Sequence, residues 1–179
     1  LRPSLLYVPF YTCNALLQPI RLNKIANKFY PINEHLEPAG GIKLQEGEYL
    51  IYINYFGIKS DVVENLISKF GNKLIVDNSQ AFFEPEHKGI FSFNSARKFF
   101  GVPDGSFLYS PMPVSETFEE NKNYSTNHLI NRALGNIETA YQEFLDYGRS
   151  ISCDVRKISA LAHKILRTND YERVSAIRR

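Results

Sequence analysis

Residues 50–77, which read LIYINYFGIKSDVVENLISKFGNKLIVD, decide the fold that we expect for this chain. The first seven residues of this stretch are rich in isoleucine and aromatic side chains and precede a glycine, which is typical of a buried strand. Apolar residues then recur with helical spacing between Asp61, which we expect to cap the helix, and Gly71, which we expect to end it. A second apolar run covers 73–77. A strand, a helix and a strand in so short a stretch predict a crossover between two parallel strands.

Strand-like segments flank this crossover on both sides. Residues 4–9 and 28–32 precede it, and a helix that either Thr12 or Asn14 could cap lies between them. Residues 89–93 and 106–110 follow it, and the turn-rich link between these two segments is too short for a crossover helix. We therefore expect the last two strands to run antiparallel. The sequence predicts an α/β fold with a mostly parallel, mixed sheet flanked by helices.

The pattern of the sequence changes after Pro113. Apolar residues recur with a period of 3.6 over 130–145 and again over 158–166, and Asp170 is placed to begin a third helix. We therefore divide the chain into a partial cofactor-binding large domain, 1–113, and a helical segment, 114–179, that leads toward a small domain. Both ends of the sequence interrupt such elements, so we expect the chain to be a piece of a longer protein.

Composition and charge exclude several classes of protein. The 179 residues are 44% hydrophobic and 22% charged, and the net charge of +2 does not favour nucleic acid or an anionic membrane as a partner. No apolar run approaches the ~20 residues needed to span a bilayer. The two cysteines are far apart, and the four histidines lack metal-ligand spacing. We expect no bound metal and a reducing, cytoplasmic setting.

Two polar residues stand where a ligand would bind in this fold class. In open α/β sheets, ligands bind beyond the carboxyl ends of the strands. Asp77 directly follows the buried run 74–76, and Gln80 lies three residues further on. An acid suits a buried strand poorly, so its place here indicates a partner, although the same residue could simply cap the following turn.

A lysine among aromatic residues is the second candidate. Lys98 stands within residues 91–101, FSFNSARKFFG. If the neighbouring aromatic side chains bury its amine, the pKa of Lys98 falls toward the range of a useful nucleophile. A surface lysine that lays its stem over apolar neighbours would have the same local sequence.

In combination, these features resemble a known family. The order is a strand-end acid, a glutamine three residues later, a Ser-Phe strand, and a lysine followed by Gly-Val-Pro-Asp-Gly. This order resembles the pyridoxal-phosphate (PLP) enzymes of the aspartate-aminotransferase fold, and among them the DegT/DnrJ/StrS sugar-aminotransferase family. The resemblance covers residues 4–110. The matched segments are VPFYTC at 8–13, NYFG at 54–57, VDNSQA at 76–81 and the stretch 91–105.

The resemblance implies a role for each candidate and makes PLP the expected cofactor. Lys98 would form the Schiff base with the cofactor aldehyde and carry a proton between carbon atoms. Asp77 would pair with the pyridinium nitrogen and keep it protonated, which makes the ring an electron sink. Gln80 would hydrogen-bond near the phenolic oxygen of the ring.

Three further residues would complete the cofactor site by the same resemblance. Ser92 or Ser95 would help to hold the cofactor phosphate, and Cys13 would cover one face of the ring. The sequence departs from the family pattern here, because Ser92 precedes Lys98 by one residue more than usual. The link from Gln80 to Ser92 is also shorter than usual.

The resemblance further implies the reaction and the assembly. The protein would be an aminotransferase that moves an amino group from glutamate to a keto-sugar nucleotide, and its active site would lie at the interface of a homodimer. An abundance of aromatic residues independently favours an interface, because a small monomer does not bury so many easily. These residues are Tyr7, Phe10, Tyr11, Tyr52, Tyr55, Phe56, Phe82, Phe83, Phe99 and Phe100.

Two other functions compete with the aminotransferase. The chain could be a catalytically weak or inactive relative of the same fold that acts as a binding or structural protein. It could also be a doubly wound nucleotide-binding domain, but the sequence contains neither GxGxxG nor GxxxxGK[ST]. The joint presence of Lys98, Asp77 and Gln80 favours the enzyme.

Overall fold

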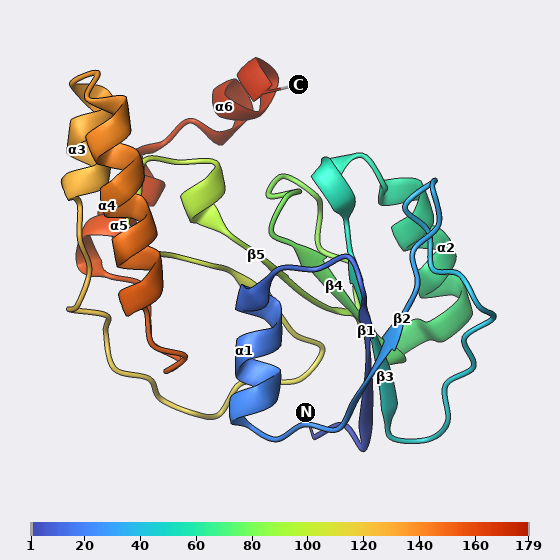
Figure 1. Cartoon of the computed structure of the whole chain (residues 1–179). Coiled ribbons are helices and arrows are strands. Elements are labelled where there is room, and N and C mark those ends of the chain that lie inside the picture. The colour runs from blue at the N-terminus through green and yellow to red at the C-terminus, as the bar shows by residue number, and fades with distance from the viewer. Residues whose placement is uncertain (1, 179) are drawn as a thin grey trace. The chain divides into compact units, whose positions relative to one another are not determined.

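The computed structural model describes residues 2–178, which form two compact units (Figure 1). Unit 1 contains the chain up to Asn94 together with Phe107–Val114. Unit 2 contains Ser95–Ser106 and the chain from Ser115 onward. The segment that carries Lys98 therefore groups with the helices of unit 2.

Unit 1 is built on a six-stranded sheet with the order β2-β1-β3-β4-β5-β6. Neighbouring strands are parallel from β2 to β5, and β6 runs antiparallel to β5. This mostly parallel, mixed α/β sheet is the predicted fold class. Its elements are β1 (Leu5–Pro9), α1 (Asn14–Leu22), β2 (Asn27–Tyr30), β3 (Glu48–Ile53), α2 (Ser60–Phe70), β4 (Leu74–Asn78), β5 (Phe91–Asn94) and β6 (Leu108–Tyr109).

The two helices of unit 1 cover opposite faces of its sheet (Figure 1). Ile20 of α1 packs with Val8 and Ile51 on one face. Val63 of α2 belongs to the larger core on the other face, which contains Leu50 and its neighbours on the central strands. Successive residues of a strand point to opposite faces, so the nearly continuous apolar runs in the sequence follow from burial on both sides.

Helix α2 begins differently from the prediction. Its first residue is Ser60, no side-chain hydrogen bond caps it, and the expected cap Asp61 lies inside the first turn. The backbone N–H before the helix, that of Lys59, donates instead to Oδ1 of Asn54 at the end of β3. Gly71 ends the helix with a positive φ of 54°, as the sequence predicts.

Unit 2 is helical, but the long helix expected over 130–145 is two helices. Gly135 has a φ of 84°, which breaks the helix between α3 and α4, and these two pack side by side (Figure 1). Asp170 accepts a hydrogen bond from the N–H of Arg173 and begins the last helix as predicted.

No helix within residues 2–178 is long and apolar enough to cross a membrane. The elements are the 3-10 turn η3 (Ala96–Lys98), α3 (Asn127–Ala133), α4 (Ile137–Ser150), α5 (Ala160–Thr168) and α6 (Tyr171–Arg178).

Candidate cofactor site

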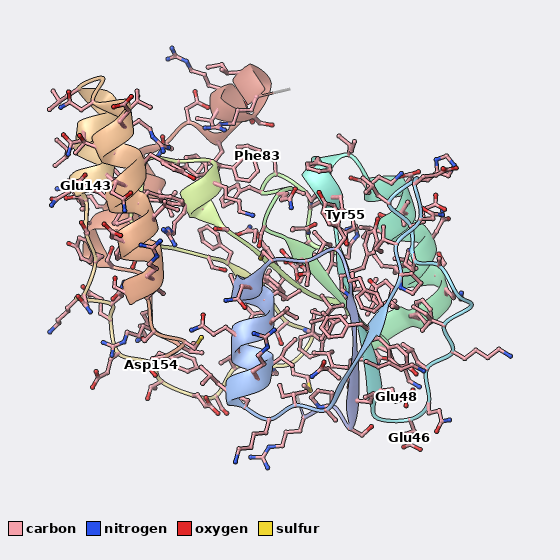
Figure 2. The ribbon with its side chains drawn as sticks, in the orientation of Figure 1. Glu46, Glu48, Tyr55, Phe83, Glu143 and Asp154 are labelled. Atoms are coloured by element: carbon pink, nitrogen blue, oxygen red, sulfur yellow. The ribbon has the colours of Figure 1, made fainter. Side chains whose placement is uncertain are left out.

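The carboxyl ends of the parallel strands of unit 1 lie at one edge of the sheet. Figure 2 shows Tyr55 just beyond the end of β3 at this edge, whereas Glu46 and Glu48 lie at the opposite one. Polar and aromatic residues follow each of the central strands here: 10–13 after β1, 54–57 after β3 and 77–80 at the end of β4. In α/β proteins this is the edge at which ligands bind.

A cleft of about 370 Å³ opens beside α1 in unit 1. Cys13, Leu16 and Pro19 line it from the helix, and Asp77 and Phe93 line it from the sheet. These last two residues lie opposite each other in the register of β4 and β5 and therefore point to the same face. Asp77 is the one charged residue among the described residues that line the cleft. The structure thus brings Asp77 and Cys13, two of the predicted cofactor ligands, to a single cleft.

Asp77 is held in place by a turn. The side chain is 5% exposed, and its Oδ1 accepts a hydrogen bond of 2.8 Å from the N–H of Ser79. The structural role considered from the sequence, capping of the following turn, is therefore real. It occupies one carboxylate oxygen, and no hydrogen bond from another described residue engages Oδ2. Asp77 can therefore serve the turn and face a ligand at the same time.

Gln80 fixes the neighbouring loop. Its Oε1 accepts a hydrogen bond of 2.9 Å from the N–H of Phe56, which follows β3. The loop comes so close that a Cβ on Gly57 would lie 2.8 Å from the backbone oxygen of Gln80. Gly57 therefore cannot be replaced without moving the backbone. The structure does not place Gln80 among the residues that line the cleft, and its amide nitrogen makes no hydrogen bond to another residue within 2–178.

Tyr55 and Asn54, to which the sequence analysis assigns no role, lie at the same edge of the sheet but are not among the residues that line the cleft. Tyr55 is buried, its hydroxyl donates to the backbone oxygen of Tyr11 at 2.8 Å, and the two rings stack at 5.4 Å. Burial raises the pKa of the Tyr55 hydroxyl well above its ordinary value, and the charge of Asp77 adds to this. Asn54 is fully buried, and its Nδ2 has no hydrogen-bond partner among the described residues. The signal for both was the polar Asn-Tyr pair at the end of an apolar strand.

Ser92 lies on the other face of the sheet. It pairs in register with Val76 on β4, whereas Asp77 pairs with Phe93. Adjacent residues of a strand point to opposite faces, so Ser92 and Asp77 do not meet. The hydroxyl of Ser92 is buried and has no hydrogen-bond partner within the described chain. The structure thus does not bring Ser92 to the cleft that holds Asp77.

Lys98 and Ser95 belong to unit 2. Lys98 ends the turn η3, and its side chain is exposed, which agrees with the surface-lysine alternative and not with burial of its amine by neighbouring aromatic residues. Phe100 is buried instead, and its ring contacts Tyr171 of α6. The backbone N–H of Ala96 donates to Gly105, which closes a compact loop around the turn. The convergence of Lys98 with Asp77 stays a prediction.

The unit 1 cleft fits part of the expected cofactor. A carboxylate between apolar walls suits a protonated pyridine ring, and the buried Oγ1 of Thr12, next to Cys13, has no hydrogen-bond partner in the described residues. Within the described chain, no lysine, arginine or histidine lines the cleft, so the cleft offers no cationic side chain for a phosphate. No group of three His, Cys, Asp or Glu side chains within residues 2–178 gathers to hold a metal.

Comparisons with known proteins give only distant structural likenesses. The sugar aminotransferase CalS13 from Micromonospora echinospora aligns with a TM-score of 0.45 and 15% identity, over 62% of this chain and 35% of that one. AtS13 from Actinomadura melliaura gives 0.45 and 13%, with the same coverages. The sphingosine-1-phosphate lyase Bpss2021 of Burkholderia pseudomallei K96243 gives 0.40 and 13%, over 76% of this chain and 41% of that one.

Sequence comparisons add nothing to these likenesses. No family model matches the chain, and no curated protein matches it significantly. The chain spans 35% of the length of CalS13 and AtS13 and 41% of the length of the lyase. The activity, substrates and partners of the whole protein are therefore proposals.

Proposed function

We propose that this chain contributes the cofactor-binding part of a PLP-dependent aminotransferase. The observation that carries the proposal is Asp77, a buried carboxylate at the carboxyl end of a central parallel strand, which faces an apolar cleft with Cys13 at its side. The order of residues from Asp77 through Gln80 to Lys98 supports it, because this order resembles the DegT/DnrJ/StrS sugar aminotransferases. By that resemblance, the amino donor is glutamate and the acceptor is a keto-sugar nucleotide.

Asp77, Cys13 and Lys98 would each have a separate role in the proposed reaction. PLP, when bound, supplies an electron-withdrawing ring that stabilises negative charge on the substrate carbon. Asp77 would keep the ring nitrogen protonated, because its carboxylate is close to apolar walls that strengthen the ion pair. Cys13 would cover a ring face, and Lys98, the exposed amine, would hold the cofactor and move the proton at the reacting carbon.

Reductive trapping tests this proposal directly. Incubation with PLP should give absorbance at roughly 400 nm, and borohydride should then attach the cofactor covalently to Lys98. The variant Lys98→Ala should lose the label, whereas Lys164→Ala, which removes an exposed lysine of the same unit, should keep it. A Lys98→Ala chain that is labelled as fully as the natural chain would exclude Lys98. If borohydride attaches no cofactor to the natural chain, the result would favour the alternative function, a catalytically inactive relative of the same fold.

We further propose that the protein is a homodimer. Phe10, Tyr11 and Phe56 are 67%, 57% and 59% exposed, and all three follow strands at the carboxyl edge of the unit 1 sheet. Exposed aromatic side chains gathered at a ligand-binding edge are typical of an interface. Of the aromatic residues counted from the sequence, Tyr52, Tyr55, Phe82 and Phe100 are core residues instead. Light scattering at micromolar concentration tests the proposal, and a monomeric mass with bound PLP would contradict it.

A further inference from the structure

A second pocket lies entirely within unit 2. It has a volume of about 400 Å³ and is formed by residues around η3, by the segment at 121–123 and by the chain that follows α4. Figure 2 shows Asp154, one of its lining residues, in the segment after α4. The volume is that of a small-molecule site rather than of a site for a single ion. Its lining shares no residue with the unit 1 cleft.

Arg97 gives this pocket an unpaired positive charge. The guanidinium is half-buried, and its central carbon lies 5.7 Å and 5.3 Å from the ring centroids of Phe144 and Tyr147 on α4. Within residues 2–178, no carboxylate oxygen lies within the 4.0 Å of an ion pair with Arg97. Aromatic contacts engage the faces of a guanidinium, whereas its N–H donors point outward along the edges. No hydrogen bond to another residue of the described chain engages these edge donors, so they remain available.

The two carboxylates of the pocket are engaged elsewhere. Asp104 accepts hydrogen bonds from Nδ2 of Asn121 at 2.8 Å and from the Oγ and N–H of Ser159 at 2.7 and 3.0 Å. Asp154 lies 3.7 Å from Arg156. Asp104 contributes some attraction to the charge of Arg97 from a distance, but its oxygens are committed to neutral donors. The pocket therefore presents a cation, and the two carboxylates that line the pocket with it have other partners.

Burial makes this arrangement costly unless a ligand compensates for it. Removing a guanidinium from water without an anionic partner is unfavourable, and burial lowers the pKa of Arg97 from its ordinary value. Ser95 and Asn123 line the same pocket, and no hydrogen bond from another described residue engages their side-chain polar groups. A hydroxyl, an amide and a guanidinium fork together match an oxyanion, which accepts several hydrogen bonds.

We propose that the unit 2 pocket binds a small organic oxyanion, a carboxylate or a phosphate monoester, whose charged group pairs with Arg97. The rest of the molecule would occupy the remaining volume, beside the hydroxyl of Ser95 and the amide of Asn123. The proposal does not depend on Lys98 or Asp77. The oxyanion could belong to a separate metabolite or to the phosphate of a cofactor, and both sources share this chemistry.

Calorimetric titration of the full 179-residue chain with four probes tests the proposal. Succinate and glycerol 3-phosphate carry the oxyanions, and succinamide and glycerol are their neutral counterparts. We expect at least one anion to bind and its neutral counterpart not to bind. Equal binding of charged and neutral probes, or no binding of either anion at millimolar concentration, would overturn the proposal. This comparison requires no variant and so does not depend on the folding of a mutant.

Variants then assign the binding to Arg97. Arg97→Met keeps an unbranched stem between the aromatic rings and removes the charge, so affinity for the bound anion should fall about tenfold to hundredfold. Arg97→Lys should retain part of the affinity. The control Arg173→Met removes an exposed arginine of α6 and should bind as the natural chain does. Unchanged affinity in a folded Arg97→Met chain would exclude the site.

Competition distinguishes the two sources of the oxyanion. If PLP displaces the bound probe and pyridoxal does not, the site holds the phosphate of the cofactor. If saturating PLP leaves probe binding unchanged, the site holds a separate small molecule. Both results support an oxyanion site at Arg97. If no anion binds in the titration, the oxyanion site is excluded, but the result of the reductive trapping of PLP on Lys98 does not change.

Discussion

The backbone N–H of Phe56 donates a 2.9 Å hydrogen bond to Oε1 of Gln80, which ties the loop after β3 to the turn after β4. Phe56 has a positive φ of 57°, a conformation that side-chain-bearing residues rarely adopt. The bond supplies an acceptor for a backbone donor that this turn would otherwise leave to solvent. Two neighbouring parallel strands are thus joined at the edge where we place the cofactor.

Replacing Gln80 with alanine should weaken this junction. The N–H of Phe56 loses its acceptor, and we expect the free energy of unfolding to fall by about 1 kcal/mol. Gln18→Ala, which truncates an exposed glutamine of α1, should change it by less than about 0.5 kcal/mol. Urea denaturation of the two variants measures the difference. Equal stabilities would show that the bond contributes nothing.

Much of unit 1 could be predicted because its determinants are local. The crossover from β3 to β4 follows from apolar periodicity and from Gly71, and the antiparallel β6 follows from the length of the link that precedes it. The start of α2 could not be predicted, because its N-terminal backbone is held by Asn54, a residue of another element. The break at Gly135 was missed because apolar periodicity continues across it.

The site was predictable in its residue types more than in its geometry. The strand-end position of Asp77 and its nearness to Gln80 are visible in the sequence, and both lie at the expected edge. The position of Ser92 depends on strand register, in which a shift of one residue reverses the face. The spacing of residues in the sequence does not show to which face of the sheet Ser92 points. Whether Lys98 or a neighbour is buried is a tertiary property, and the structure buries Phe100 against Tyr171 and leaves Lys98 exposed.

Asp77→Asn should separate the structural role of this residue from its chemical role. Asparagine retains an oxygen that can accept the hydrogen bond from the N–H of Ser79, so we expect stability to change by no more than about 1 kcal/mol. The amide cannot keep a pyridine nitrogen protonated, so reductive trapping of PLP should be at least about tenfold slower. Asp61→Asn, an exposed position on α2, is the matched control. Trapping at the natural rate in Asp77→Asn would contradict the assigned role.

Asp104 should be a main determinant of the stability of unit 2. Its carboxylate accepts both the N–H and the hydroxyl of Ser159, a fully buried residue that also caps α5. Asp104→Ala leaves both donors without an acceptor, and we expect a loss of about 2–3 kcal/mol. Asp154→Ala removes an exposed carboxylate that accepts a hydrogen bond from Ser152 and lies 3.7 Å from Arg156, and it should cost less than about 0.5 kcal/mol because both interactions face solvent. Thermal denaturation of both variants checks this difference, which should disappear if Asp104 is only a surface acid.

His128 should make the stability of unit 2 depend on pH. It is 3% exposed, and its ring lies 5.6 Å from that of Tyr147. Burial lowers the pKa of His128, the charges of Arg97 and Arg132 lower it further, and Glu143 opposes them. The imidazole of His128 therefore binds a proton at higher pH in the unfolded chain than in the folded chain. The contribution of neutral His128 to the free energy of unfolding is fully present above about pH 6.5, and it is lost as the pH falls below that value.

The variant His128→Phe tests this directly. Phenylalanine retains the aromatic contacts, and it removes a buried Nδ1 that has no hydrogen-bond partner among the described residues. We expect the melting temperature of His128→Phe to fall less between pH 8 and pH 5 than that of the natural chain, since the variant cannot take up this proton. His163→Phe, at an exposed position of α5, should retain the natural dependence. If the three chains lose stability in parallel as the pH falls, the acid sensitivity comes from other groups and His128 has no part in it.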